Sequence, residues 1–227
     1  MARINVPEIA MAETNINKEF DDYRVLLAQE KEKHSGAVTV GSIALNADPF
    51  TVGHRFIVEK AAGESDALYV FVVEGEKPLL PWDERVELAA KALGDLKNVT
   101  VLKSGRFVAP TLRAPGYFDE TAAAEVAIDT CLDVRLFVKH IIPTLGVNAR
   151  FVGTEPASPI LTQYNRAMKA ILTRNNVKFV EHERFAHNGK PVSATVVRDL
   201  IKAKNSAEIK ELVPETVYAY LTQKFGL

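Results

Sequence analysis

The sequence has few of the features that mark secreted, membrane or nucleic-acid-binding proteins. Its 227 residues include a single cysteine, Cys131, which excludes an internal disulfide and a zinc site built from cysteines. No apolar run approaches the ~20 residues of a membrane-spanning helix, and the first residues lack the pattern of a secretory signal. The 28 basic and 29 acidic residues give a formal net charge of −1, so no positive excess favours nucleic acid. We expect a cytoplasmic protein that binds neither nucleic acid nor membranes.

Apolar runs alternate with helical patterns along most of the chain. Residues 38–45 and 67–73 have the continuous apolar composition of buried strands. Each is followed by a helical pattern, the first running from His54 to a stop at Gly63. This alternation predicts an α/β fold with a parallel sheet. Further strands are expected near residues 99–102, 150–152 and 177–180, and further helices near residues 81–93, 121–142, 161–173, 207–212 and 214–225.

The first part of the chain predicts a helix outside the sheet. Phe20, Tyr23, Leu26 and Leu27 recur at helical spacing within residues 17–33, as in an amphipathic helix that packs on a main body. We expect residues 1–36 to form an N-terminal helical appendage, disordered before residue 17, and residues 37–227 to form the α/β domain.

The loop after the first strand has residue types suited to phosphoryl chemistry. Residues 51–54, Thr-Val-Gly-His, lie at a predicted helix N-terminus, where free backbone N–H groups and the positive end of the dipole suit phosphate oxygens. Gly53 lacks a Cβ and permits close approach to a ligand. Thr51 and His54 can donate hydrogen bonds to an oxygen that gains negative charge. The alternative is an ordinary turn with a capping threonine and a surface histidine.

A second junction between a loop and a helix follows at residues 191–198. Ser193 and Thr195 could cap the helix, and Arg198 lies within its first turns. Two hydroxyls, free N–H groups and a guanidinium would make a phosphate cradle; the alternative is an ordinary N-cap followed by an exposed arginine. Ligands of open parallel sheets bind beyond the carboxyl ends of the strands. We therefore expect both junctions to lie at that edge, together with the loops at residues 74–80 and 153–156.

The two junctions resemble the H/T-x-G-H signature and the I-S-S-T-x-x-R-like motif of the nucleotidyltransferase superfamily. The longer string SIALNADPFTVGH, at residues 42–54, is similar to the citrate lyase ligase family, and the similarity extends over residues 17–227. The other strings that carry it are FVV, PWDERVEL, TLRAPGYF, IDTCLDVRLF, RFVGTEP, QYNRAM and LVPETVYAYL. The resemblance implies a Rossmann-like parallel sheet with helices on both faces, of the nucleotidyltransferase type. There are two departures: a short appendage stands in place of the family's acetyltransferase-like domain, and Val196 stands where the second motif usually has a basic residue.

What the resemblance implies is an ATP-dependent acetate:thiol ligase. It would adenylate acetate and then acetylate the prosthetic-group thiol on the acyl carrier subunit of citrate lyase, activating that enzyme. Its cofactors would be ATP and Mg²⁺, with the metal held by phosphates and water rather than by a protein site. His54, Thr51 and Arg198 would be catalytic. The residues expected to bind the nucleotide are Ser42, Asn46, Gly53, Gly153, Thr154, Glu155, Ser193 and Thr195.

Two loops supply further candidates. Lys77 could reach the phosphates, or could simply be a solvated lysine. Arg106 and Arg113, among the aromatic residues of the loop at 104–118, could line the acceptor side. Of these, Arg113 could hold a small carboxylate in bidentate form; alternatively, both arginines only solvate the loop.

Two other functions stay open at this point. An adenylyltransferase that acts on a phosphate acceptor, such as pantetheine phosphate or nicotinamide mononucleotide, would share both motifs. A non-catalytic nucleotide-binding or regulatory module would keep the phosphate cradle without turnover.

Overall fold

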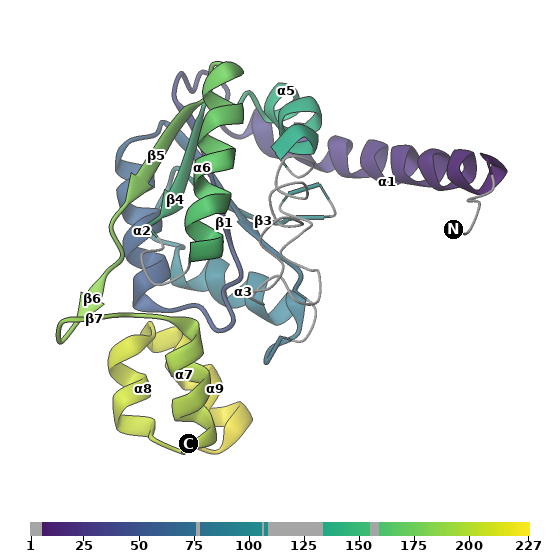
Figure 1. Ribbon diagram of the computed structural model, residues 1–227. Helices are drawn as coiled ribbons and strands as arrows, with labels where there is room; N and C mark the ends of the chain where they lie inside the picture. Colours follow the sequence, from purple (N-terminus) through teal and green to yellow (C-terminus); the bar gives the residue numbers. More distant parts are fainter. Residues whose placement is uncertain (1–5, 76–77, 106, 109–133, 155–158) are drawn as a thin grey trace.

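A parallel sheet in the order β3-β2-β1-β4-β5 forms the centre of the protein (Figure 1). The computed structural model describes residues 6–75, 78–105, 107–108, 134–154 and 159–227, with side chains from residue 18 onward except that of residue 160. The strand order runs outward from β1 to β3 and then continues on the other side of β1, so it reverses between β1 and β4. Open α/β sheets bind ligands at such a reversal. The strands are β1 (Val40–Leu45), β2 (Ala67–Val72), β3 (Val99–Lys103), β4 (Ala149–Gly153) and β5 (Lys178–His182).

Helices cover both faces of this sheet, as the resemblance implied. On one face lie α2 (Val52–Gly63) and α3 (Trp82–Ala92), with α7 (Ala194–Lys202), α8 (Ser206–Leu212) and α9 (Glu215–Phe225) gathered at one end of the sheet. On the other face lie α1 (Val6–Glu32), a π-helical turn (Phe137–Ile141) that continues into α5 (Ile142–Leu145), and α6 (Pro159–Arg174). None of the described helices is both long and apolar enough to cross a membrane.

Two apolar clusters hold the three layers together. Successive side chains of a strand point to opposite faces, so in β2 Leu68 and Val70 join the cluster under α2 and α3, while Tyr69 and Phe71 join the cluster under α1 and α6. Every residue of β2 is buried, which agrees with its continuous apolar sequence. The alternation of strands and helices predicted from the sequence is therefore confirmed for the described residues, while residues 121–133 of the helix predicted at 121–142 lie outside them.

Helix α1 packs on the sheet as predicted, although it is longer than expected. Leu27 is fully buried, Phe20 packs edge-on against Phe107 at 4.8 Å, and the Tyr23 hydroxyl donates to the Lys103 carbonyl over 2.7 Å. The expectation of disorder before residue 17 is wrong for residues 6–16, which continue the helix. Leu26 was assigned to the buried face but is 44% exposed, because a residue next to Leu27 points about 100° away from it around the helix.

Two other local predictions need correction. The helix predicted over residues 121–142 was expected to end at Pro143, but Pro143 lies in α5, directly after the π-helical turn. The helix ends at Gly146, in the left-handed conformation with φ 76°. A short hairpin, β6 (Ala186–His187) and β7 (Lys190–Pro191), was not predicted. Its turn, Asn188-Gly189, has positive φ at both residues, which is the usual chemistry of a two-residue hairpin loop.

Candidate functional site

Thr51 and His54 form a reciprocal cap at the start of α2. The Thr51 hydroxyl oxygen accepts the backbone N–H of His54 over 3.2 Å, and Nδ1 of His54 accepts the backbone N–H of Thr51 over 3.0 Å. Such a capping box satisfies two helix N–H groups and fixes the orientation of both side chains. Since Nδ1 is an acceptor, the neutral imidazole carries its proton on Nε2. The sequence thus places a hydrogen-bond donor at the helix terminus that follows β1.

The electrostatic surroundings keep His54 neutral. Its half-buried ring packs against Phe50 at a centroid distance of 5.5 Å, and burial lowers its pKa to about 4, with the nearby charge of Arg184 acting in the same direction. Arg184 follows β5, and its Nε donates to the carbonyl oxygen of Thr154 over 3.1 Å. The start of α2 and the ends of β4 and β5 therefore meet around a neutral donor and a cation.

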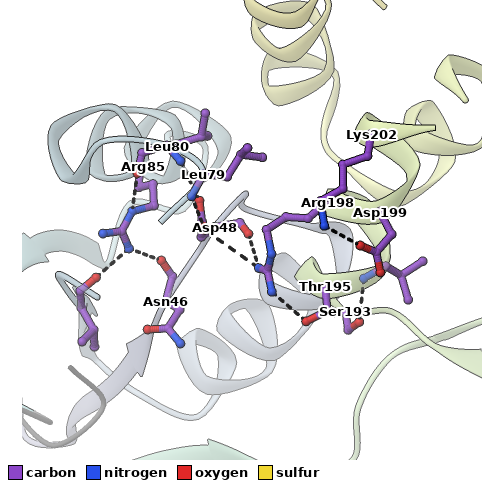
Figure 2. Close-up of polar contacts among 12 residues, drawn as sticks. Asn46, Asp48, Leu79, Leu80, Arg85, Ser193, Thr195, Arg198, Asp199 and Lys202 are labelled. Atoms are coloured by element: carbon purple, nitrogen blue, oxygen red, sulfur yellow. Dashed lines mark hydrogen bonds and ion pairs between the residues drawn. The ribbon is translucent and has the colours of Figure 1, made fainter. Parts of the chain in front are cut away.

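Arg198 joins the second junction to the first loop (Figure 2). Its Nη1 donates to the carbonyl oxygen of Asp48 over 2.7 Å, and its Nη2 donates to the Thr195 hydroxyl over 2.8 Å. Ser193 caps α7 by accepting the N–H of Val196 over 3.3 Å. A guanidinium has five N–H donors, and as far as the described residues show, these bonds use two of them. The side chain is 33% exposed, so the remaining donors suit an anion at this edge.

Asp48, in the loop after β1, also holds the neighbouring loop at residues 74–80. Its carboxylate oxygens accept the backbone N–H groups of Leu79 and Leu80 over 2.8 and 2.9 Å, which connects the loop at 74–80 with the loop after β1. The structure thus brings these two loops and the start of α7 together, as expected from the parallel sheet. The role of Asp48 was not predicted, since a buried aspartate that holds a distant backbone has no local sequence signal.

Arg85 is a second residue that the sequence analysis missed. Its side chain is 1% exposed, and its Nη1 donates to the carbonyl oxygens of Asn46 and Val73 over 2.5 and 2.6 Å. Nε donates to the Leu80 carbonyl over 3.1 Å, and Nη2 donates to the Glu74 carbonyl. Burial lowers its pKa. One guanidinium thereby ties α3 to the ends of both β1 and β2 (Figure 2).

The two candidate glycines have packing reasons for lacking a side chain. A Cβ on Gly53 would lie 3.2 Å from the Val192 carbonyl oxygen, and a Cβ on Gly153 would lie 2.8 Å from Cδ1 of Ile57. Gly53 was predicted to admit a ligand; in the structure its open side is occupied by the segment before α7. Both glycines allow chain segments to approach each other at the reversal of the sheet.

The remaining predicted nucleotide-binding residues are not all at the edge. Ser42 is buried in the middle of β1, and its hydroxyl donates to the Ala149 carbonyl over 3.3 Å, so the structure does not bring it to the other candidates. Asn46 is exposed just beyond β1, and Thr154 follows β4 directly. Glu155, Lys77, Arg106 and Arg113 lie outside the described residues.

The family model and the curated relatives that match this chain agree on one family. The family model of the citrate lyase ligase C-terminal domain matches residues 40–221. The chain is 34% identical over 191 residues to citrate (pro-3S)-lyase ligase of Klebsiella pneumoniae, covering 81% of this chain and 55% of that protein. It is 32% identical over 197 residues to the Escherichia coli K12 protein of the same name, covering 85% of this chain and 56% of that protein. The chain thus spans about half the length of the curated relatives it matches.

More distant similarities concern the nucleotidyltransferase scaffold. Phosphopantetheine adenylyltransferase of Methylobacillus flagellatus is 47% identical over 57 residues, which are 24% of this chain and 36% of that protein. A solved putative nicotinate-nucleotide adenylyltransferase of Vibrio parahaemolyticus has a TM-score of 0.52 at 14% identity, covering 81% of this chain and 97% of that chain. Thermotoga maritima TmcAL bound with alpha-thio ATP has a TM-score of 0.50 at 14% identity, covering 83% of this chain and 56% of that chain.

These two structures show the fold alone, which is that of the nucleotidyltransferases. The family model covers most of the chain, from β1 to the last helix, and the curated relatives carry the same family name. The protein therefore belongs to the citrate lyase ligase family and corresponds to its C-terminal domain.

Proposed function

We propose that this protein is an ATP-dependent acetate:thiol ligase that activates citrate lyase. It would use ATP, acetate and Mg²⁺, and would acetylate the prosthetic-group thiol on the acyl carrier subunit. Family membership supports the proposal. The observation that carries it is the arrangement at the reversal of the sheet, where the Nε2–H of His54 and the guanidinium of Arg198 are both held by backbone groups of the loop after β1.

In the first step, a carboxylate oxygen of acetate attacks the α-phosphorus of ATP. The bond from this phosphorus to the pyrophosphate breaks, and its electron pair leaves with the pyrophosphate. We assign the Nε2–H of His54 and the N-terminus of α2 to a non-bridging α-phosphate oxygen, where negative charge increases. A fixed donor at that position lowers the barrier because it needs no reorganisation during the reaction.

The leaving pyrophosphate would be held at the start of α7. Arg198, Ser193 and Thr195 converge there, and the Arg198 guanidinium is already oriented by its bonds to Asp48 and Thr195. Arg184 supplies a second cation close to His54. Charge stabilisation and positioning, rather than covalent chemistry, would thus account for most of the rate.

Magnesium in this proposal is bound mainly by phosphate oxygens and water. The Asp48 carboxylate lies 3.9 Å from the Arg198 guanidinium, and both of its oxygens already accept backbone N–H groups. No group of three His, Cys, Asp or Glu residues suited to a metal ion occurs in the part of the chain that the structure describes. The substrate phosphates, together with water, therefore have to supply most of the ligands, and the metal would neutralise their charge.

In the second step, the carrier thiol attacks the carbonyl carbon of acetyl-AMP. The bond from this carbon to the phosphate oxygen breaks, AMP leaves, and a thioester remains on the carrier. Because the proposed activity uses ATP and a carrier subunit, we expect the protein to act in the cytoplasm.

Exchange of labelled pyrophosphate into ATP tests the first step. We expect exchange that depends on acetate and magnesium. The match to phosphopantetheine adenylyltransferase makes phosphopantetheine the informative competing acceptor, with nicotinamide mononucleotide beside it. Exchange with either of these but not with acetate would assign the protein to the adenylyltransferases. ATP binding without exchange under any acceptor would indicate a regulatory module.

A further inference from the structure

Five exposed cations lie on two neighbouring helices in a part of the molecule that the proposed reaction does not use. One helix is α6, and the other is the helical segment at residues 134–145, which contains the π-helical turn and α5. Both helices line one small internal space, through Val134, Phe137, Tyr164, Met168 and Leu172, so they lie side by side (Figure 1). We call their solvent side the basic face. Its cations are Arg135, Lys139, Arg166, Lys169 and Arg174.

The helical repeat points the central cations of this face away from the sheet. Arg166 is two residues from both Tyr164 and Met168, which are buried, so it points about 200° around the helix from each of them. Arg135 and Lys139 are both exposed, and their spacing of four residues places them on one side of their helix.

The described residues supply no carboxylate that neutralises the basic face. Neither α6 nor the segment at 134–145 contains an aspartate or a glutamate, and none of the five cations is paired with a carboxylate in the part of the chain that the structure describes. Exposed lysines on other helices do have such partners, as Lys33 has in Glu30 at 2.7 Å and Lys91 in Glu87 at 2.6 Å. An uncompensated group of cations produces a positive potential that attracts an acidic partner.

A buried charge beneath the basic face adds to this potential. Arg150 of β4 borders the same internal space and is 5% exposed, and its Nη1 is buried without a hydrogen-bond partner among the described residues. Burial lowers its pKa only to about 10, so the guanidinium is charged at neutral pH. Because a buried charge is screened less than an exposed one, Arg150 contributes to the field over both helices.

The basic face begins beside the carboxyl edge of the sheet. The Asn165 side chain donates to the carbonyl oxygen of Gly153, the last residue of β4, over 3.1 Å. Arg166 is the next residue of α6, and Gly153 and Thr154 belong to the candidate site described above. A partner bound to the basic face is therefore next to the edge where the nucleotide is expected. A flexible arm that carries a thiol could cross that edge to reach it.

We propose that the basic face is the docking surface for the acyl carrier subunit, which would bind through an acidic surface of its own. The identity of the partner rests on the proposed function, in which a carrier thiol has to reach acetyl-AMP. Contacts between exposed charges are weak and salt-dependent, which suits a carrier that must dissociate after each acetylation.

The surroundings of the basic face favour a protein over a nucleic acid. The His140 ring packs against Phe20 of α1 at a centroid distance of 4.3 Å, so α1, with its exposed Asp21 and Asp22, is the neighbour on one side. On the other side, the exposed Glu181 of β5 accepts a hydrogen bond from an α6 amide over 3.3 Å. These carboxylates would repel a continuous phosphate backbone, whereas a folded partner can match both signs of charge.

Binding of the purified carrier subunit, with its prosthetic-group thiol free, tests this docking surface. The variant Arg166→Glu with Lys139→Glu reverses two charges of the basic face. The matched control, Lys60→Glu with Lys91→Glu, makes the same change in charge on α2 and α3, on the opposite face of the sheet. At low salt we expect the basic-face variant to associate about tenfold more slowly, and the control to stay within about twofold of wild type. Melting temperatures check that both variants fold.

Pyrophosphate exchange separates the docking surface from the proposed chemistry, because exchange needs acetate but no carrier. Both double variants should exchange like wild type, whereas the KM for the carrier in the acetylation step should rise about tenfold in the basic-face variant only. The docking surface is overturned if the carrier does not bind wild-type protein or binds both double variants equally. It is also overturned if a duplex RNA binds wild type more tightly than the carrier does and is lost in the basic-face variant. Absence of exchange in wild type, with carrier binding that still depends on the basic face, would reject the acetate chemistry alone.

Discussion

The backbone N–H of Thr51 donates to Nδ1 of His54, at 3.0 Å, while the Thr51 hydroxyl accepts the backbone N–H of His54, at 3.2 Å. The same two residues therefore begin α2 and determine which imidazole nitrogen carries the proton. A helix cap, a local feature of the sequence, thus orients the group that we assign to the α-phosphate.

His54→Ala should lower the rate of acetate-dependent exchange about 100- to 1,000-fold, which is roughly 3–4 kcal/mol. A donor aimed at developing charge stabilises the transition state more than bound ATP, so the apparent affinity for ATP should change much less. Steady-state kinetics on folded protein measure both quantities.

His34→Ala is the control for loss of a histidine. His34 lies before β1, at the opposite end of the strands, and its Nε2 is 2.7 Å from the Thr100 hydroxyl. It should retain wild-type turnover. Near-normal turnover of His54→Ala with weakened ATP binding would show that His54 only binds substrate.

The lowered pKa of His54 predicts a pH dependence of stability. Between pH 6.5 and about 4 the unfolded chain holds a proton that the folded state lacks, so the free energy of unfolding falls as the pH decreases through this window. The loss amounts to at most about 3 kcal/mol. His54→Gln cannot titrate, so the difference in urea midpoint between it and wild type should change over this window and be constant above pH 7. A constant difference from pH 4 to 7 would contradict the assignment.

Much of the fold could be predicted because its signals are local. The apolar run of β2, the Pro81 start of α3 and the Thr51 cap each depend on neighbours in the sequence. Ser42 was predicted to bind the nucleotide because it lies inside the motif that resembles the family. In the structure its position within β1 buries its hydroxyl, which donates to the Ala149 carbonyl instead.

Arg85 and Arg184 were missed for a different reason. Each donates to one carbonyl group that lies 30 or more residues away in the sequence: that of Asn46 for Arg85 and that of Thr154 for Arg184. A basic residue has no sequence pattern that distinguishes such bonds from solvation. For Arg184 the one available hint was its position just after a predicted strand, at the ligand-binding edge.

Arg198→Ala should mainly weaken the apparent affinity for ATP, about ten- to a hundredfold, as expected for loss of charged hydrogen bonds. The guanidinium is held by Asp48 and Thr195 before any ligand arrives, so it meets the phosphates in the ground state and in the transition state alike. Lys202→Ala, one turn further along α7 and paired with Asp199 at 3.1 Å, is the control and should have little effect. A fall in turnover with unchanged affinity for ATP would assign Arg198 to the transition state instead.

Arg85→Met tests whether a single buried side chain holds the loop geometry. The substitution leaves the carbonyl groups of Asn46, Val73, Glu74 and Leu80 without their donor, and unsatisfied buried acceptors are costly, so the free energy of unfolding should fall by about 3–5 kcal/mol.

Arg85→Lys should lower the free energy of unfolding by an intermediate amount. A compact ammonium cannot reach all four carbonyl groups that the planar guanidinium contacts. The control is Lys91→Met on the same helix, an exposed residue paired with Glu87 at 2.6 Å, which should change stability by less than about 0.5 kcal/mol. Urea unfolding measures all three variants. Of the two Arg85 variants, Arg85→Lys should be the better folded. Its exchange activity should fall further than its loss of stability explains, because Asn46 and the backbone that anchors Arg198 lose a fixed support. Wild-type activity together with a wild-type urea midpoint in both Arg85 variants would show that the loop holds its shape without this residue.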